Sequence, residues 1–587
     1  MPNTVWYADQ KSEFTLQTPG ELRGFAQLVN EGNDFSGRTV KLGRDIDASS
    51  GDWTPIASTS KTPFKGVFDG ADHRITYQIS SCEEYDMALF GYLDSAELKN
   101  LTVAGQNAAK AASTINKGTA GLCASATNSK IADCTNRVEI SQGGQNTAGI
   151  VGTSTNCVIE NCVNEADITG GKKNVAGIVA NAGNKNTATA CTLIRNCTNE
   201  GTITGGGGGM GSPTPGAGGI VAAYAASATL SAPAIENCRN TGAVIATNTN
   251  VGGIVGAFTG WMRGCENTAE IDGNGKNVIG GIAGLLQATT NAESRIEKCR
   301  NSGNVYGRTS TGGIVGNTQC AVRNAKIQIV NCENTGNVLT NKTDGTIGTG
   351  NGGIIGLSSF PTSAGWNNSN AGTALYMQSC ISYVETNPEL KAVGTLFNKE
   401  TAKPTRSYEA VYALGEEDEG LAYDGTKPLT VNAEGFKKTA MAIKLNKAVG
   451  ENFWGYKEDT AYPLFNGFAE YPITEIVFKP FTSEDAAKYR IDLVSGGKSL
   501  TLNNGGTEKS MDMPYDFAAK LRIYDAEDKT KFAKAVLVSG GKNSGLQDAK
   551  DIPIRAAGQN ITVFYGDEAG YENFVFTDWY DDTAEEL

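Results

Sequence analysis

Residues 235–244 read IENCRNTGAV, and close copies of this phrase recur along the first two thirds of the chain. In seven copies a cysteine is followed two residues later by asparagine and six residues later by Ile or Val. An even offset keeps two side chains on one face of a strand, so the cysteine and the later Ile or Val can face the same interior. The seven cysteine and asparagine pairs are Cys134–Asn136, Cys162–Asn164, Cys197–Asn199, Cys238–Asn240, Cys265–Asn267, Cys299–Asn301 and Cys332–Asn334.

The residues just before each cysteine predict a corner in the chain. An apolar residue, such as Ile131 or Ile235, stands three positions before the cysteine. This odd offset requires a bend if both side chains are to point inward. In five copies the residue directly before the cysteine is Asn or Asp, the residue types that tolerate left-handed backbone. These five residues are Asp133, Asn161, Asn196, Asn237 and Asn331.

A second repeated block has the pattern Gly-apolar-apolar-small. It reads AGIVG from Ala148, GGIVG from Gly252 and GGIIG from Gly352, and ALFG from Ala88 is a degenerate copy. From Ala120 onward, successive copies start 28, 28, 42, 34, 28, 32 and 40 residues apart, which indicates a 28-residue unit lengthened by surface insertions. A period of this size with short β-type segments is typical of one solenoid turn. We therefore predict an all-β chain built on a right-handed parallel β-helix with three short strands per coil.

In such a stack the cysteines form a column, because equivalent residues of neighbouring coils lie about 4.8 Å apart. In the degenerate unit ELKNLTV the matching position is Leu101. A site that accepts Leu is a packing site, and Cys behaves there as a small buried hydrophobe. We expect the column cysteines to be reduced, buried and inert. Disulfides remain alternatives for Cys157 with Cys162, Cys191 with Cys197 and Cys320 with Cys332.

The chain offers no recognisable metal or cofactor motif. Its single histidine is His73, and it contains no CxxC pair. Zinc sites are usually built from such pairs or from paired histidines, so we expect neither a metal nor a cofactor. A Cys–His catalytic pair would also place this lone base near the first coil, far from most cysteines.

Charged residues beside the cysteines alternate in sign from coil to coil. If the coils stack in sequence order, each charge has opposite neighbours, and such cross-strand pairs contribute about 0.2 to 1 kcal/mol each. A catalytic carboxylate cluster would instead hold like charges together at raised pKa. One column contains Glu160, Arg195, Glu236, Arg263 and Glu297, and the other contains Arg239, Glu266, Arg300 and Glu333.

Both flanks of the repeats have the pattern of end caps, which a solenoid needs to cover its open core. Residues 18–32 predict a helix, because Thr18 and Glu21 have the spacing of a capping box. Residues 433–450 repeat the amphipathic pattern, and the chain after Pro472 alternates polar and apolar residues with a period of two. The predicted parts are an N-terminal cap (1–47), a β-helix of nine to ten coils (48–383), a C-terminal capping region (384–471) and a β-sandwich-like domain (472–587).

Composition argues against nucleic acid as a partner and against a membrane-spanning segment. The net charge of −13 argues against nucleic acid, whose phosphates require clustered Lys and Arg. No run of 18 or more apolar residues is present, so we predict no transmembrane segment in this chain. We expect a monomer.

The repeated blocks resemble those of GLUG-motif proteins of bacterial surfaces. The resemblance rests on GGIVG, on FKGVFDGADHRITY at residues 64–77 and on the phrase NCxNxG, and it covers about residues 12–467. It implies a secreted, extracellular protein associated with the cell surface or cell wall of a gut-type bacterium, with its signal and anchor outside this chain. In some members the repeats support an enzyme domain. The motifs are structural, so the resemblance transfers no catalytic residue.

Three functions fit these features. The first is a non-catalytic cell-surface protein, an adhesin or scaffold that contacts host or matrix glycan or protein through the solenoid surface. The second is a carbohydrate-active β-helix enzyme, either a glycoside hydrolase or a polysaccharide lyase, although the sequence identifies no catalytic residue. The third is a glycan-binding accessory module.

Insertions that lengthen the 28-residue unit suggest where a ligand would bind, because they often emerge on the binding face of a solenoid. Tyr224 and Trp366 lie in such insertions, and Trp261 stands one residue before an interior Met262 and should point outward. Aromatic rings at these places can stack on sugars or anchor a protein. We therefore predict a contact surface around Trp366, Trp261 and Tyr224, whereas Phe360 is expected to cover the coil.

Overall fold

The structure is a computed structural model of the 587-residue chain, and it divides into two compact units. The first unit comprises Met1–Gly415 and Tyr423–Thr430, and the second comprises Glu416–Ala422 and Val431–Leu587. The structure describes residues 1–80, 86–108, 118–170, 173–183, 191–205, 216–246, 248–289, 292–320, 324–343, 345–359, 373–397, 405–416, 419–422, 425–437, 439–457, 460–472, 474–478, 489–495, 498–501, 509–513, 518–525, 527, 533–538, 547–549, 551–555 and 560–565.

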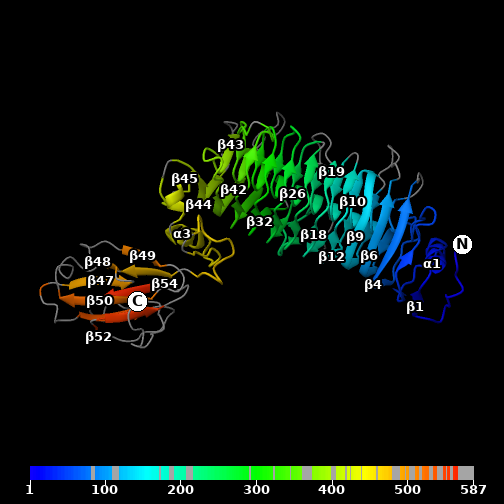
Figure 1. Cartoon of the computed structure of the whole chain (residues 1–587), viewed down its shortest axis with the longest axis horizontal. Helices are drawn as coiled ribbons and strands as arrows, with labels where there is room; N and C mark the ends of the chain where they lie inside the picture. The colour runs from blue at the N-terminus through cyan, green and yellow to red at the C-terminus, as the bar shows by residue number, and fades with distance from the viewer. Residues whose placement is uncertain are drawn as a thin grey trace. The chain divides into compact units, whose positions relative to one another are not determined.

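The first unit is a parallel β-helix, in which the strands of successive coils lie side by side (Figure 1). One coil consists of β10 (Asn146–Ala148), β11 (Val151–Thr155), β12 (Val158–Glu160), β13 (Val163–Asn164) and β14 (Ile168–Gly170). Each of these strands pairs in parallel with its equivalent in the next coil. The equivalents are β15 (Asn174–Ala176), β16 (Val179–Gly183), β17 (Leu193–Arg195), β18 (Thr198–Asn199) and β19 (Ile203–Gly205). The prediction of a parallel β-helix is confirmed, but this coil has five short strands where three were predicted.

The coils build three sheets among the described residues. Besides β11 and β16, the ten-stranded sheet contains β5 (Phe90–Asp94), β8 (Cys123–Thr127), β21 (Val221–Ala225), β26 (Val255–Thr259), β31 (Ala283–Ala288), β36 (Val315–Cys320), β41 (Ile355–Ser359) and β43 (Val393–Phe397). Besides β10 and β15, the eight-stranded sheet contains β7 (Gly118–Ala120), β20 (Ala217–Gly218), β25 (Val251–Gly252), β30 (Ile279–Gly280), β35 (Thr311–Gly312) and β40 (Asn351–Gly352).

The third and largest sheet has 27 strands and carries the cysteine motifs. Besides the six strands already given, it contains β1 (Glu13–Leu16), β2 (Thr39–Leu42), β3 (Ile46–Asp47), β4 (Val67–Ile79), β6 (Glu97–Asn107), β9 (Lys130–Gly143), β22 (Ile235–Glu236), β23 (Arg239–Asn240), β24 (Val244–Ala246), β27 (Trp261–Arg263), β28 (Glu266–Asn267), β29 (Ile271–Asp272), β32 (Ser294–Glu297), β33 (Arg300–Asn301), β34 (Val305–Tyr306), β37 (Lys326–Val330), β38 (Glu333–Asn334), β39 (Val338–Leu339), β42 (Ala374–Ser382), β44 (Thr405–Leu414) and β45 (Leu429–Val431).

Corners form where the sequence places Asn or Asp before the cysteine. Asp133, Asn161, Asn196, Asn237 and Asn331 all have φ between 51° and 54°, which is left-handed backbone. Side chains of this column also bond from coil to coil, since Asn161 Nδ2 donates to Asp133 Oδ1 at 3.0 Å. Residue type and backbone conformation therefore agree at each corner, as the sequence predicts.

The cysteines that follow these corners stack in the interior. The register pairs Leu101 with Cys134 at one end of the column and Cys380 with Val411 at the other. All of these side chains are at most 1% exposed. The Ile and Val residues six positions later are also buried, but they pack in a separate cluster with residues of the eight-stranded sheet, such as Val175. Each coil therefore encloses two apolar clusters. The six-residue offset had predicted that the cysteine and the later Ile or Val share a single interior.

A ladder of buried asparagines runs along the same sheet. Six of the seven asparagines that stand two residues after a column cysteine donate from Nδ2 to Oδ1 of the equivalent asparagine in the next coil, at 2.7 or 2.8 Å. Nδ2 also donates to the carbonyl two residues on, so the amides are paired within the interior. The ladder runs through Asn136, Asn164, Asn199, Asn240, Asn267, Asn301 and Asn334.

The second repeated block makes room for this ladder. A Cβ at Gly149 would lie 2.2 Å from Asn164 Oδ1, and a Cβ at Gly219 would lie 2.2 Å from Asn240 Oδ1. Any larger residue would therefore collide with the amide column and with the backbone of the next coil. The Gly block and the Cys-x-Asn phrase therefore pack against each other, and each requires the residue types of the other.

The helix expected at residues 18–32 is present as α1 (Pro19–Asn30), at the N-terminal end of the β-helix (Figure 1). Its capping box is formed, because Glu21 N donates to Thr18 Oγ1 and Thr18 N donates to the Glu21 carboxylate. Arg23 donates to the carbonyls of Ala48 and Ser50, which ties the helix to the first coil. Phe25 on its inner face is fully buried.

The second unit contains α2 (Ala433–Phe436) and α3 (Thr439–Val449), followed by two sheets. The five-stranded sheet has the order β49 (Lys509–Met513), β46 (Thr474–Phe478), β54 (Asn560–Tyr565), β51 (Ala533–Val538) and β52 (Gln547–Ala549). The four-stranded sheet has the order β48 (Lys498–Thr501), β47 (Tyr489–Ser495), β50 (Ala518–Asp525) and β53 (Asp551–Arg555). Within the described part of the chain, no helix is both long and apolar enough to cross a membrane.

Candidate functional site

One outward-facing column of the large sheet carries the sites described below, and we name it the outer column. Its members stand four residues before the cysteine column and one residue before a buried apolar residue such as Ile131 or Ile159. Because side chains alternate along a strand, this position faces away from the core, except at Ala234, which is 1% exposed and packs in the main apolar cluster. The outer column contains Val67, Glu97, Lys130, Val158, Leu193, Ala234, Trp261, Arg295, Gln328 and Tyr376.

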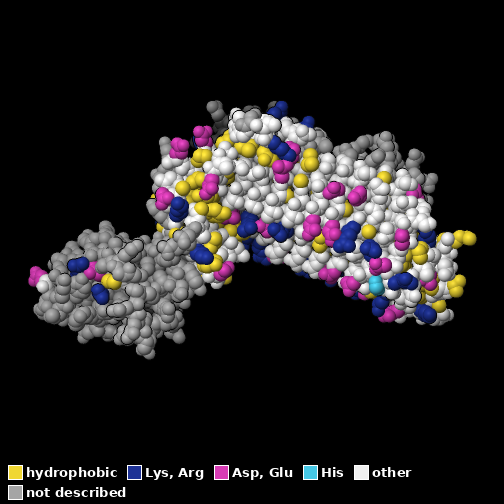
Figure 2. Space-filling view, viewed as in Figure 1, with side chains coloured by type: hydrophobic (Ala, Val, Ile, Leu, Met, Phe, Trp, Pro, Cys, Tyr) yellow, Lys and Arg dark blue, Asp and Glu magenta, His cyan; other side chains and the backbone are white. Residues whose placement is uncertain are grey.

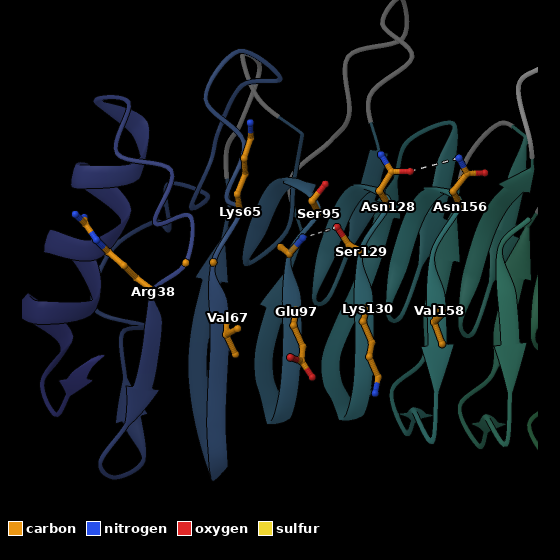
Figure 3. Close-up of a pocket in the computed structure, with 13 residues that line it drawn as sticks. Arg38, Lys65, Val67, Ser95, Glu97, Asn128, Ser129, Lys130, Asn156 and Val158 are labelled. Carbon is orange, nitrogen blue, oxygen red and sulfur yellow. Dashed lines mark hydrogen bonds between the residues drawn. The ribbon is translucent and has the colours of Figure 1, made fainter. Parts of the chain in front are cut away.

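A groove of about 390 Å³ crosses the first members of this column. Figure 3 shows Lys65, Ser95, Asn128 and Asn156 near the starts of the strands, whereas Glu97, Lys130 and Val158 lie on the strands themselves. The groove takes its residues from β4, β6, β9, β12 and the turns that precede them, and from Gly37 and Arg38 before β2. It spans five levels of the stack, or roughly 19 Å at about 4.8 Å per level.

The rim of the groove is a row of polar corners. Ser95, Asn128 and Asn156 have φ of 57°, 50° and 55°, and they stand six residues before the cysteine column. Asn156 Nδ2 donates to Asn128 Oδ1 at 3.4 Å, and Ser129 Oγ accepts from the backbone N–H of Ala96 at 3.1 Å. The Oδ1 atom of Asn156 is buried without a hydrogen-bond partner among the described residues. The rim thus presents fixed amides and hydroxyls.

Charges around the groove are paired with one another. Lys130 Nζ lies 2.9 Å from Glu160, which also pairs with Arg195 at 2.8 Å. These contacts, the hydrogen bond from Lys130 first, hold the pKa of Glu160 below its usual value. Among the described residues that line the groove, Glu97 is the one carboxylate. Glycoside hydrolysis normally uses a pair of carboxylates, and the described lining of the groove supplies one.

The charge columns form ion pairs between coils, as their alternating signs predict. Arg239 and Arg300 flank Glu266 at 3.2 and 2.6 Å, and Arg263 pairs with Glu236. Figure 2 shows basic and acidic side chains next to one another along the face of the β-helix in view. The column ends differently at Glu333, whose Oε1 is buried without a partner among the described residues. Burial raises the pKa of Glu333 to about 8.

The structure places the three predicted contact residues apart. Trp261 begins β27 on the outer column and is half-buried. Its Nε1 donates to Glu297 Oε2 at 3.2 Å, and the Arg295 guanidinium lies over its ring at 5.2 Å. Trp366, like Phe360, lies outside the described residues, so its place beside Trp261 stays a prediction.

Tyr224 requires a correction, because it lies in the interior of the first unit. Its side chain is 3% exposed, and its hydroxyl donates to the carbonyl of Thr192 at 3.0 Å. Strand β21 continues to Ala225, and the register pairs Tyr224 with Phe258 of the next coil, whose ring centroid is 5.6 Å away. The insertion begins after this strand, so the ring fills the core and offers no surface to a ligand.

The described cysteines form no disulfide, including the three pairs considered as alternatives. Within the column, burial raises the pKa of Cys265 and Cys332 well above the usual thiol value. Thiol groups also donate to backbone carbonyls, such as Cys162 Sγ to the carbonyl of Glu160 at 3.3 Å. The enclosed thiols have the environment of packing residues.

A signal for the groove was present in the sequence. The polar residues Ser95, Asn128 and Asn156 recur at the same offset from the cysteine column and would have indicated a polar rim. The groove also needs Lys65 and Glu97, which belong to the first, degenerate coils and match no repeated motif.

These features define a parallel β-helix repeat protein with a polar groove and an aromatic cleft on one sheet. Among the described residues, no three His, Cys, Asp or Glu side chains are grouped to hold a metal ion. No protein-family model matches the chain, and no curated protein or solved structure matches it. The resemblance to GLUG-motif proteins therefore stays a prediction.

Proposed function

We propose that this chain is a non-catalytic bacterial cell-surface protein, an adhesin or scaffold that holds a host or matrix glycan or protein along the outer column. The observation that carries the proposal is the placement of the groove and of a second cleft, at Trp261, on the same column of the same sheet. Leu193 and Ala234 stand between them, and three coil steps span roughly 14 Å. A polymer with a repeating structure can reach both places at once, which raises its apparent affinity.

The charges favour binding over chemistry. Lys130 is engaged by Glu160, and Arg295 is engaged by Glu297, so the walls present paired charges at both places. A general acid needs a raised pKa within reach of a second carboxylate, whereas the pKa of Glu160 beside the groove is lowered. Fixed amides and hydroxyls along the rim supply hydrogen bonds without the entropy cost of ordering them.

An extracellular location at the cell surface is part of the proposal. It rests on the resemblance of the repeated blocks to GLUG-motif surface proteins and on a net charge of −13, which disfavours nucleic acid as a partner. Free cysteines are compatible with an oxidising exterior here, because the column thiols are enclosed. Parallel side chains spaced about 4.8 Å apart also exceed the Cβ separation of a relaxed disulfide.

Retention of the full chain on immobilised polysaccharides and extracellular matrix proteins tests the proposal. Val158→Trp fills the groove, whereas Val163→Trp makes the same change in the same coil on a neighbouring outward column. We expect Val158→Trp to lower retention at least tenfold and Val163→Trp to leave it unchanged. Retention on none of the surfaces would overturn the proposal, and so would release of reducing ends or unsaturated products from a retained polysaccharide.

A further inference from the structure

The cleft beside Trp261 has a volume of about 110 Å³ and takes its lining from four levels of the stack. Thr229 and Leu230 come from the segment after β21, Trp261 begins β27, and Arg295 belongs to β32. Gln328 of β37 follows Arg295 on the outer column. The volume is roughly four times the 30 Å³ that a water molecule occupies in the liquid, so the cleft admits one small ring.

The segment at Thr229 forms a fixed wall of the cleft. Thr229 Oγ1 accepts from the backbone N–H of Glu293 at 3.1 Å, across a separation of 64 residues. Leu230 packs against the main apolar cluster. The insertion is therefore held to a later coil at the edge of the cleft.

The indole ring is held in place before any ligand arrives. Glu297 accepts from Trp261 Nε1 at 3.2 Å and pairs with Arg295 at 3.0 Å, while Arg295 also covers part of the ring. Glu297 is only 7% exposed, so this contact is sheltered from water. A ring that is already oriented loses little conformational entropy when a ligand stacks on it.

The polar groups of the cleft favour a neutral ligand rich in hydroxyl groups. Glu293 pairs with Lys326 at 3.0 Å and Arg295 pairs with Glu297, so the charged groups compensate one another. Gln328 makes no side-chain hydrogen bond with another described residue, which leaves its amide donor and acceptor for a ligand. Each cation described at the cleft already has a carboxylate partner, which an anionic ligand would have to displace. The hydroxyl groups of a sugar can instead donate to the Glu293 carboxylate and bond to the Gln328 amide.

We propose that the Trp261 cleft binds one pyranose ring of a neutral glycan, with the ring stacked on Trp261 and hydroxyls bonded to Gln328 and Glu293. The inference rests on the proposed function and adds a ligand class to it. Stacking on an aromatic ring and amide hydrogen bonds suit a sugar ring, and the carboxylate partners of Arg295 and Lys326 disfavour an anionic one. The groove provides the more extended contact, and the cleft provides the local selectivity.

Calorimetric titration of the full chain with cellotetraose, mannotetraose and xylotetraose tests this site, with tetragalacturonate as the anionic probe. We expect one or more neutral tetraoses to bind and Trp261→Ala to weaken that binding at least tenfold. Gln328→Leu keeps the size of the side chain and should weaken it about threefold to tenfold, even if Trp261→Ala disturbs folding. Val163→Trp, on a neighbouring outward column, should bind as the wild type does.

Binding of tetragalacturonate alone, of none of the neutral probes, or equally by wild type, Trp261→Ala and Gln328→Leu would overturn the inference. The retention assay distinguishes failure of this inference from failure of the proposed function. If Val158→Trp lowers retention while Trp261→Ala changes neither retention nor titration, the cleft assignment fails and the proposed function stands. If the wild type is retained on no surface, the proposed function fails regardless of the titration.

Discussion

The interior columns of the β-helix repeat the same residue from coil to coil, whereas the outer column changes at almost every step. Cysteine and asparagine recur in seven coils at their two interior positions. The outer column instead runs through Lys130, Val158, Leu193, Ala234 and Trp261 within five coils. In the interior, each side chain packs against the equivalent side chains of the coils before and after it, so a substitution in one coil disturbs two others. On the outer column, a change in side-chain size is accommodated by solvent, so these positions can vary and carry binding groups.

The largest effect is expected where the interior repetition is broken at the asparagine ladder. Asn240 accepts from Asn199 and donates to Asn267 and to the carbonyl of Gly242. Asn240→Ala therefore removes this partner from Asn267 Oδ1 and from the Gly242 carbonyl, and it leaves Asn199 Nδ2 with the Gly201 carbonyl alone. Each such group costs about 1–3 kcal/mol, and we expect a loss of about 4 kcal/mol in the free energy of unfolding. Urea unfolding followed by circular dichroism measures it. The turn residue variant Asn277→Ala should change stability by less than about 0.5 kcal/mol, and an equal loss in both variants would contradict the ladder's role.

Spacing alone was enough to predict the coil, because buried positions repeat and their offsets show which residues share a face. The same offset rule places Asn136 on the same inward face as Cys134, so a buried column of asparagines could be predicted from the sequence. The glycine block that contains Gly149 carried the matching signal, since only glycine leaves room for the amide of Asn164. Neither signal specifies hydrogen bonds by itself, and the two segments meet only once the coil has closed.

The site was less predictable, because its parts belong to different coils and to irregular segments. Tyr224 was misplaced because β21 runs on to Ala225, so the insertion starts later than the repeat suggested. Trp261 was correctly expected to face outward, since it alternates with Met262. The groove depends on where the corner at Asn156 stands relative to Lys65 several coils away, and sequence spacing does not give that distance.

The next largest effect on stability is expected at Glu333, where the alternation of charges along one column ends. The register places Arg300 on one side of it and Ile381 on the other, and Arg300 already bonds to Glu266. Burial raises the pKa of Glu333 from 4.5 to about 8, so the folded state keeps the proton that the unfolded state releases above pH 4.5. Stability from this group is therefore complete below pH 4.5 and is lost as the pH rises to about 8.

Glu333→Gln should remove this pH dependence, because the amide stays neutral. We expect the variant to be more stable than the wild type by about 3 kcal/mol at pH 9, below the ceiling of about 5 kcal/mol that the full shift implies. The two proteins should have nearly equal stability at pH 4. Urea unfolding at pH 4, 6, 7.5 and 9 follows the difference, and a constant difference across that range would show that Glu333 is not buried as a neutral acid.

A smaller effect is expected in the cysteine column, where Leu101 shows that an apolar side chain is accepted. Cys238→Ser places a hydroxyl among buried thiols and should cost about 1–3 kcal/mol, whereas Cys238→Val should cost less. Native thiol labelling should also leave Cys162, Cys238 and Cys299 unmodified until denaturant is added. Rapid labelling of these residues in the folded protein would show that the column is accessible and would undo its assignment as packing.

The smallest effect on stability is expected from substitutions on the outer face of the large sheet. Its size shows how strongly folding constrains the residues on that face. Arg195 pairs with Glu160 at 2.8 Å, and the register places Glu236 on its other side. Arg195→Glu puts three carboxylates in succession, yet the Arg195 side chain is 46% exposed, and exposed pairs are worth about 0.2–1 kcal/mol. We expect a loss of about 1 kcal/mol at low salt that shrinks in 1 M salt, with Arg195→Gln losing less than half as much. A loss comparable to that of Asn240→Ala would mean that the outer face is constrained like the interior, and its variation could not then be attributed to binding.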